Sequence, residues 1–287
     1  MKKLTFINAS GGEVVFTNSP PYVLRKFTEG EGINLYFSKG AQQDGAVYLG
    51  NTLDVRDITV EFVILADSEE ELIAYRSKIN RTINPKLGEG RLVYQDDLKI
   101  CESTCILNKM PIFVNLNSVA CTGLISITSA KSFWGDLTES KEEIALWRGD
   151  FEFPLEITAA GIEMGHREPS LIVNVNNSGD VECGMRVEFK ALATVVNPSI
   201  LNVNTQEYIK LDKTMQAGEL ITVSTYFGAK KMESTLNGAV TNAFNAIDFG
   251  STFLQLAIGD NLFRYDADAN LDNLEVSIYY TPQYLGV

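Results

Sequence analysis

The stretch that decides the fold is Arg56-Asp57-Ile58-Thr59-Val60-Glu61-Phe62-Val63-Ile64-Leu65. Its even-numbered residues from Ile58 to Ile64 are apolar, and Asp57, Thr59 and Glu61 lie between them. This period of two is typical of a strand with one buried face, and Val63 is the one departure from it. The stretch therefore predicts a strand over 57–65 whose apolar face meets a core.

A helix is predicted directly after this strand, over about 68–83. Ser68 and Glu71 have the spacing of a capping box, and the acidic residues 69–71 suit the positive end of the helix dipole. Apolar residues recur on one face, at Leu72, Tyr75, Ile79 and Ile83. Asn84-Pro85 ends the helix, because proline disfavours helical geometry in the residue before it. The helix is expected to cover one face of a sheet.

The remainder of the first half predicts further strands. Gly88-Glu89-Gly90 is typical of a turn into a strand with Leu92 and Tyr94, and β-rich runs follow at 112–116 and 124–128. Strands with one helix predict a small α+β domain, a sheet or sandwich. The composition shifts at about 131–150, where charged residues gather at 139–143. We therefore expect domains at 1–138 and 139–287, with one continuous sandwich as the alternative.

The second half is expected to be nearly all β. Strands are predicted over 171–175, 181–189, 208–211, 220–225, 253–258, 262–265 and 274–280. Turns are predicted at 176–180, Asn237-Gly238 and Gly259-Asp260-Asn261, and a short turn of helix at 242–249. Short strands with regularly spaced turns predict an antiparallel sandwich or jelly roll. The fold class is thus mainly β.

Charge is distributed unevenly along the 287 residues, whose formal net charge is −13. Residues 1–138 contain 14 Lys+Arg and 16 Asp+Glu, which gives a net charge of −2. Residues 139–287 contain the remaining 10 Lys+Arg and 21 Asp+Glu, which gives a net charge of −11. The second half would repel phosphates, which argues against sequence-specific nucleic-acid binding, although a negative wall lets DNA pass without sticking. The sequence also predicts no signal peptide and no membrane helix, hence synthesis in a cytosol.

The candidates for catalysis are few and weak. His166 is the one histidine, and its Gly- and Pro-flanked segment predicts a loop. Glu152 and Glu156 lie on one face of a predicted strand, about 13 Å apart at strand rise, farther than the roughly 5–9.5 Å used by glycosidases. No nucleophile elbow, phosphate-binding loop or dinucleotide motif is present.

Metal and ligand sites are equally weakly indicated. Cys101, Cys105, Cys121 and Cys183 lack zinc-site spacing and are expected to be buried, reduced and apolar in behaviour. Residues 266–272 resemble the start of a calcium loop but lack its glycine and terminal glutamate, so an acidic hairpin turn is favoured. Seven aromatic residues could bind sugar or peptide, although a core role is commoner: Trp134, Trp147, Tyr226, Phe227, Tyr279, Tyr280 and Tyr284. The sequence thus predicts no catalytic, cofactor-binding or metal-ligating residue.

Two stretches resemble the distal tail protein family of long-tailed phages that infect Gram-positive bacteria. The first joins the strand from Arg56 through the helix to Ile83-Asn84-Pro85-Lys86-Leu87-Gly88-Glu89-Gly90-Arg91-Leu92-Val93-Tyr94. The second runs from Gly218 through Asn237-Gly238 and Ile247-Asp248-Phe249-Gly250 to Gly259-Asp260-Asn261-Leu262-Phe263-Arg264-Tyr265-Asp266 and residues 278–287.

The resemblance implies a structural part of a virion tail tip, of phage or prophage origin, and not an enzyme. It implies a ring-forming N-terminal β domain with one helix, a galectin-like C-terminal sandwich and a homo-hexameric ring. The implied partners are the tail tube protein and a tail-associated lysin, tail fibre or receptor-binding protein, with DNA leaving through the central channel and no cofactor. Two alternatives stay open: a carbohydrate-binding adhesion module that contacts the host cell wall, and a cell-wall hydrolase.

Overall fold

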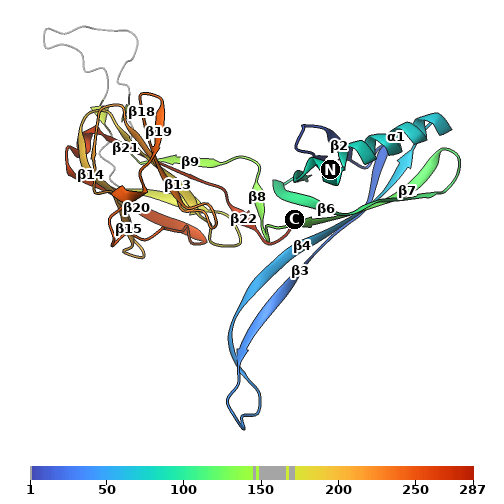
Figure 1. Ribbon diagram of the computed structural model, residues 1–287, viewed down its shortest axis with the longest axis horizontal. Helices are drawn as coiled ribbons and strands as arrows, with labels where there is room; N and C mark the ends of the chain where they lie inside the picture. Colours follow the sequence, from blue (N-terminus) through green and yellow to red (C-terminus); the bar gives the residue numbers. More distant parts are fainter. Residues whose placement is uncertain (1, 145–146, 149–165, 168–171) are drawn as a thin grey trace, which may run out of the picture. The chain divides into compact units, whose positions relative to one another are not determined.

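The computed structural model describes residues 2–144, 147–148, 166–167 and 172–287. The chain packs as two units, which are Met1–Leu137 with Tyr284–Val287 (unit 1) and Thr138–Gln283 (unit 2). Antiparallel strands dominate both units (Figure 1), and among the described residues the single α-helix is α1 (Glu69–Thr82). The predicted mainly β fold class is confirmed.

Unit 1 is a folded antiparallel sheet with strand order β2-β1-β5-β6-β7-β4-β3. Its strands are β1 (Lys3–Ile7), β2 (Glu13–Phe16), β3 (Tyr22–Ser38), β4 (Val47–Leu65), β5 (Gly90–Gln95), β6 (Ile100–Asn115) and β7 (Ala120–Ser129). Strand β6 belongs to both parts of the sheet, because residues 100–105 pair with β5 and residues 106–115 pair with β7. The two parts and α1 enclose one core, to which they contribute Leu4, Phe62, Ile79 and Leu92.

The strand–helix unit agrees with the sequence pattern. Ile58, Val60, Phe62 and Ile64 of β4 are buried, and α1 begins at Ser68, whose side chain accepts a hydrogen bond from the Glu71 amide at 3.2 Å. The Glu71 carboxylate accepts from the amide of Asp67, one residue before the cap, instead of from Ser68. Strand β4 begins ten residues earlier than predicted, which has consequences for the site below.

Unit 2 is a sandwich of two antiparallel sheets, ordered β12-β20-β14-β15 with β16 on β14, and β19-β18-β17-β13-β21-β9. Side chains between the sheets form the second core, including Met185, Phe189, Ile221 and Phe263. The first sheet contains β12 (Ile172–Asn177), β14 (Val195–Asn202), β15 (Tyr208–Lys210), β16 (Thr214–Met215) and β20 (Gly259–Ala269). The second contains β9 (Ser140–Glu143), β13 (Met185–Ala191), β17 (Leu220–Ser224), β18 (Lys231–Leu236), β19 (Ala239–Asn242) and β21 (Leu274–Tyr280).

The remaining elements are short. The short strands are β8 (Trp134–Asp136), β10 (Trp147–Arg148), β11 (His166–Arg167) and β22 (Gln283–Tyr284). The 3-10 turns are η1 (Pro85–Leu87), η2 (Phe244–Ala246) and η3 (Leu271–Asn273). Turn η2 lies in the segment predicted to form a short turn of helix.

Three predictions for the second half were wrong. The segment 253–258 is not a strand and makes one isolated β-bridge, between Leu256 and Cys183. The side chain of Asn261 accepts a hydrogen bond from the Ala257 amide and donates one to the Ala257 carbonyl, so these backbone groups are not available for pairing with a strand. The expected turn at Gly259-Asp260-Asn261 is the start of β20, where the Asp260 carboxylate binds the side-chain amides of Asn174 and Asn176.

The third wrong prediction is the acidic hairpin turn at 266–272. Strands β20 and β21 belong to different sheets, so this segment carries the chain from one sheet to the other. The predicted strand 181–189 also begins later, at Met185, and β14 was missed because Asn197-Pro198 lies inside it.

Gly123 of β7 offers a stability test for unit 1. A Cβ added there would lie 2.1 Å from Cζ of Phe62, whose ring covers the glycine, whereas a Cβ at Gly30 of β3 meets no atom within 4 Å. Overpacking costs about 1–3 kcal/mol, so Gly123→Ala should lower the free energy of unfolding by that amount in urea titrations. Gly30→Ala is the matched control and should change it by less than about 0.5 kcal/mol. Equal effects of the two substitutions would contradict this packing.

Candidate functional site

The residues with potential chemistry are dispersed. All four cysteines are buried and free, as predicted, and burial together with the charge of Glu89 raises the pKa of Cys105 to about 12. Burial and Glu182 raise the pKa of Cys183 to about 12 as well. Neutral thiols in apolar surroundings are poor nucleophiles and metal ligands. Across the described residues, no group of three His, Cys, Asp or Glu side chains is placed to hold a metal ion.

The predicted catalytic candidates do not form a site. Glu152 and Glu156 lie outside the described residues. His166 was expected in a loop, but its backbone belongs to β11, which pairs with β10. Among the aromatic candidates, Trp134 and Tyr280 are core residues, whereas Phe227 is fully exposed.

The acidic residues of unit 2 make structural contacts. In the segment 266–272, which resembles the start of a calcium loop, Asp268 accepts hydrogen bonds from Lys210 at 2.8 Å and from Asn197 at 2.9 Å, and these bonds lower its pKa. Glu219 is 2% exposed and accepts from Lys213, from Ser234 and from the amide of Gln216. Burial acts to raise the pKa of Glu219, but these hydrogen bonds outweigh it and hold the pKa below its usual value.

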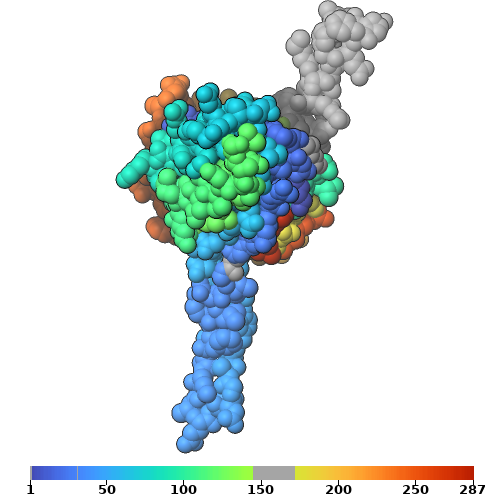
Figure 2. Space-filling model, turned by 90° about the vertical axis from the view of Figure 1, so that its right-hand side faces the viewer, coloured from blue at the N-terminus to red at the C-terminus, as the bar shows by residue number. Residues whose placement is uncertain are grey.

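The most unusual surface of unit 1 is the arm, residues 31–55, formed by the distal parts of β3 and β4. Figure 1 shows these two strands continuing as a ribbon beyond the rest of unit 1, and Figure 2 shows the ribbon standing clear of the other atoms. The pairing of β3 with β4 has three register shifts, between Leu24 and Lys26, Glu31 and Ile33, and Tyr36 and Phe37. Register shifts of this kind bend a ribbon and increase its twist.

One face of the arm is mainly apolar, and the opposite face is more polar. Ile33 pairs with Leu53 and Phe37 with Tyr48, and the Phe37 and Tyr48 rings lie 5.9 Å apart. Leu35 lies between Ile33 and Phe37 on this same side, by the alternation of a strand, and it pairs with Asn51, whose side-chain amide donates a hydrogen bond to the Tyr48 hydroxyl. The opposite face carries Asn34 and Ser38, which pair with Thr52 and Val47, and also Tyr36, whose hydroxyl is 3.0 Å from Oγ1 of Thr52. The arm is therefore a ribbon with one mainly apolar face, and it stands clear of the other described residues of unit 1 (Figure 2).

A buried polar cluster marks the base of the arm. Arg56, with 1% of its side chain exposed, donates to the Glu29 carboxylate at 3.0 Å and to the carbonyls of Ser132 at 2.5 Å and Leu285 at 2.7 Å. Glu29 also accepts from Nε1 of Trp134 at 2.7 Å and from the Val287 amide at 3.1 Å. This Arg56 cluster fastens the segment 284–287 to the point where the arm leaves the core.

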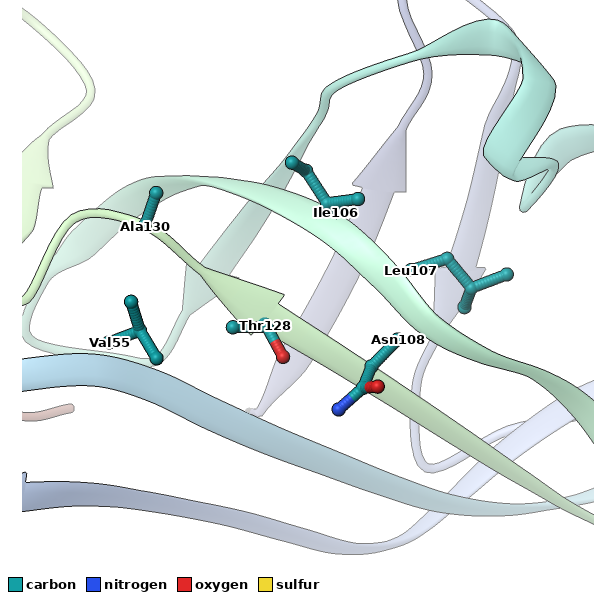
Figure 3. A pocket seen from close by; sticks show the side chains of 6 residues that line it. All are labelled: Val55, Ile106, Leu107, Asn108, Thr128 and Ala130. Carbon is teal, nitrogen blue, oxygen red and sulfur yellow. The ribbon is translucent and has the colours of Figure 1, made fainter.

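An open cavity of about 350 Å³ lies beside this base (Figure 3). It is lined by Val55, Ile106, Leu107, Asn108, Thr128 and Ala130. Its polar side chains are the Thr128 hydroxyl and the Asn108 amide, and neither titrates near neutral pH. The cavity thus offers apolar contact surface and no acid, base or nucleophile pair.

Each of the two units matches a known protein family. Residues 9–123 match the model of the phage tail protein RIFT-related domain, and residues 178–284 match the C-terminal domain of the siphovirus-type tail component. These matches, one in each unit, define the class: a structural component of a phage tail or baseplate. Together they cover most of the sequence, and the chain belongs to the siphovirus distal tail (Dit) protein family.

Solved structures show the same fold at low sequence identity. The crystal structure of SPP1 Dit, described as a paradigm of the hub adsorption apparatus in phages infecting Gram-positive bacteria, has a TM-score of 0.69 at 11% identity, with 98% of each chain covered. A chain of the phage P2 baseplate in its activated conformation with calcium has a TM-score of 0.53 at 11% identity, with full coverage of both chains. No curated protein matches the sequence.

Removal of the Arg56 side chain should destabilise unit 1. Arg56→Ala leaves the Glu29 carboxylate without its cation, and breaking a buried ion pair costs about 3–5 kcal/mol. Arg91→Ala is the control, because Arg91 is 54% exposed in its 3.2 Å pair with Glu102 and should lose less than about 1 kcal/mol. Urea unfolding monitored by tryptophan fluorescence measures both. A loss at Arg56 no larger than that at Arg91 would show that the cluster contributes little.

The lowered pKa of Glu219 predicts a pH dependence of stability. A carboxyl group with a lower pKa in the folded state stabilises the fold above its unfolded pKa of about 4.3, and this contribution is lost as the pH falls through the folded value. Glu219→Gln should therefore lower the urea midpoint more at about pH 7 than at about pH 3. Parallel pH profiles of the wild type and the variant would contradict a charged Glu219 in the fold.

Proposed function

We propose that this chain forms the homo-hexameric ring at the tip of a virion tail and joins the tail tube to the proteins beyond it. Residues 1–138 are the ring-forming domain, and residues 139–287 are the galectin-like sandwich. The function is one of assembly and not of catalysis. Family membership supports the tail or baseplate role.

Two open strand edges in unit 1 carry the proposal. Beyond Leu24, whose amide donates to Thr17, the outer edge of β3 has no partner strand among the described residues. Residues 106–115 of β6 pair with β7 on one side and with no described strand on the other. Unpaired edges are templates for pairing with another chain.

The directions of these edges suit a ring. The pairs β6–β7, β7–β4 and β4–β3 are all antiparallel, so β6 and β3 run in opposite directions. The β3 edge of one copy can therefore continue the sheet of the next copy at β6 while keeping antiparallel pairing. Such a head-to-tail contact gives a closed ring where the rotation between copies closes.

The proposed partners follow from this position in the virion. One side of the ring binds the tail tube protein, and the other binds a tail-associated lysin, tail fibre or receptor-binding protein. DNA passes through the central channel without sequence-specific contacts, which agrees with the acidic charge balance. Assembly takes place in the cytoplasm of the bacterial host.

A carbohydrate-binding role in host adhesion is the second candidate, and one feature of unit 2 favours it. A cavity of about 250 Å³ is lined by Lys230, Glu233, Asn242 and Phe244 among others, and the Phe244 ring stacks on Phe253 with centroids 6.0 Å apart. Polar groups beside an aromatic face are typical of sugar sites. A glycan array with wild type and Phe244→Ala tests it, and equal or absent signals would exclude this cavity.

The ring proposal predicts the mass of the assembly. Native mass spectrometry and negative-stain microscopy should show particles of six chains of 31.7 kDa with a central hole, in solution or after mixing with a tail tube protein. The antiparallel edge pairing should protect the amides of residues 106–115 from hydrogen exchange in the ring relative to the monomer. A protein that stays monomeric at high concentration and with the tube partner would overturn the proposal.

A further inference from the structure

The apolar face of the arm has a large uncovered area. Ile33, Leu35, Phe37 and Tyr48 are 60, 54, 56 and 51% exposed, and Leu53 of the same face is partly exposed. A two-stranded ribbon of this kind is marginally stable alone, and a contiguous exposed apolar patch is typical of an interaction site.

This face is the continuation of the core face of the sheet. Along β4, Ile58 and Val60 are buried, Arg56 follows in the buried cluster, and Leu53 lies next on the same side after the register shift. Along β3, Phe27 packs against the core, and Glu29, Ile33 and Leu35 follow by alternation. The arm thus continues the apolar face of the sheet beyond the residues that other described parts of unit 1 cover.

The register of the sheet indicates what lies opposite when copies pair at their edges. Gly30 pairs with Asp57, Asp57 with Thr128, and Thr128 with Ile106, so Gly30 and Ile106 lie at one level of the sheet. With neighbouring copies level, the arm from Gly30 to Ser38 overruns Ile106 of the next copy by eight residues, about 26 Å at strand rise. The turn between β5 and β6 lies the same number of residues from Ile106, at Leu98.

This β5–β6 corner, residues 96–100, complements the arm in chemistry. Leu98 is 93% exposed and Ile100 is 39% exposed, and both present apolar surface. Asp97 belongs to the corner, and Lys39 at the end of the arm carries the opposite charge at the same level. Apolar contact with a peripheral pair of opposite charges is a common arrangement in protein interfaces.

We propose that the apolar face of the arm, Ile33, Leu35, Phe37, Tyr48 and Leu53, docks on the β5–β6 corner around Leu98 of a second copy of this chain. The inference rests on the proposed ring and adds to it a second contact, separate from the paired strand edges. In this contact the apolar face of the arm packs on the neighbouring copy, and its more polar face remains on the surface of the assembly.

Site-specific photocross-linking tests the contact in the full-length chain. The cross-linker p-benzoylphenylalanine replaces Phe37 on the apolar face or, as the matched control, Tyr36 on the polar face. After irradiation, denaturing gels and mass spectrometry should show covalent dimers for position 37, with adducts at residues 96–106 of the second copy. Position 36 should give several-fold fewer dimers. Particle images of the same samples record whether rings are present.

A second variant separates this contact from the ring itself. Leu35→Glu places a charge on an exposed position, so the fold should persist, while the yield of dimers from position 37 should fall several-fold. A second substitution tests the site directly. In the Leu35→Glu background, Leu98→Lys places a positive charge opposite the introduced carboxylate and should recover the cross-linking.

Each outcome bears on one of the two proposals. Rings without cross-links from position 37, or with adducts only outside residues 96–106, would refute the arm contact and leave the ring proposal standing. Cross-linked dimers at the predicted residues in a protein that never forms rings would support the arm contact and refute the hexamer. Unchanged dimers in Leu35→Glu would also refute the arm contact, and a loss of dimers that Leu98→Lys does not restore would refute its placement at Leu98.

Discussion

The buried ion pair between Arg56 and Glu29 sets the limit of the core in unit 1. Burying a guanidinium is costly unless its donors find acceptors, and here the Glu29 carboxylate and the carbonyls of Ser132 and Leu285 accept from it. On one side of this pair, β4 lies under α1 and the second part of the sheet. On the other side, the described residues of unit 1 leave the same strand uncovered. The charged pair thus lies between the buried core and the exposed apolar residues of the arm.

Much of unit 1 could be predicted because its signals are local. The alternation from Ile58 to Ile64 and the cap at Ser68 each depend on a few neighbouring residues, and both recur in the structure. The Arg56 cluster could not be predicted in this way, since Arg56 and Leu285 are 229 residues apart in the sequence. The early half of β4 was also missed, because register shifts and Gly50 break the period of two that marks a strand.

In unit 2 the errors have a common physical origin. Residues 253–258 have the composition of a strand, but the side chain of Asn261 binds the backbone that a neighbouring strand would pair with. Residues 259–261 have the composition of a turn, but Asp260 finds two asparagine donors on β12. In both places a tertiary polar contact to the backbone or side chains of the segment outweighed local propensity, whereas the regularly alternating β21 was predicted with the bounds it has.

The candidate surface shows why composition is a poor guide to assembly. Ile33, Leu35 and Phe37 alternate with polar residues as in any half-buried strand, and the pattern does not say whose residues bury them. Only the fold reveals that these side chains lie beyond the Arg56 cluster.

Exposed edges and apolar ribbons are hazards for a free protein, because they also permit open-ended association. In the proposed ring the register shifts of the arm limit this hazard: they twist the ribbon, so that an uncontrolled flat stack of arms is disfavoured, while a neighbour at a fixed rotation can still receive one. The twist that the register shifts give the arm is thus compatible with the proposed closed ring.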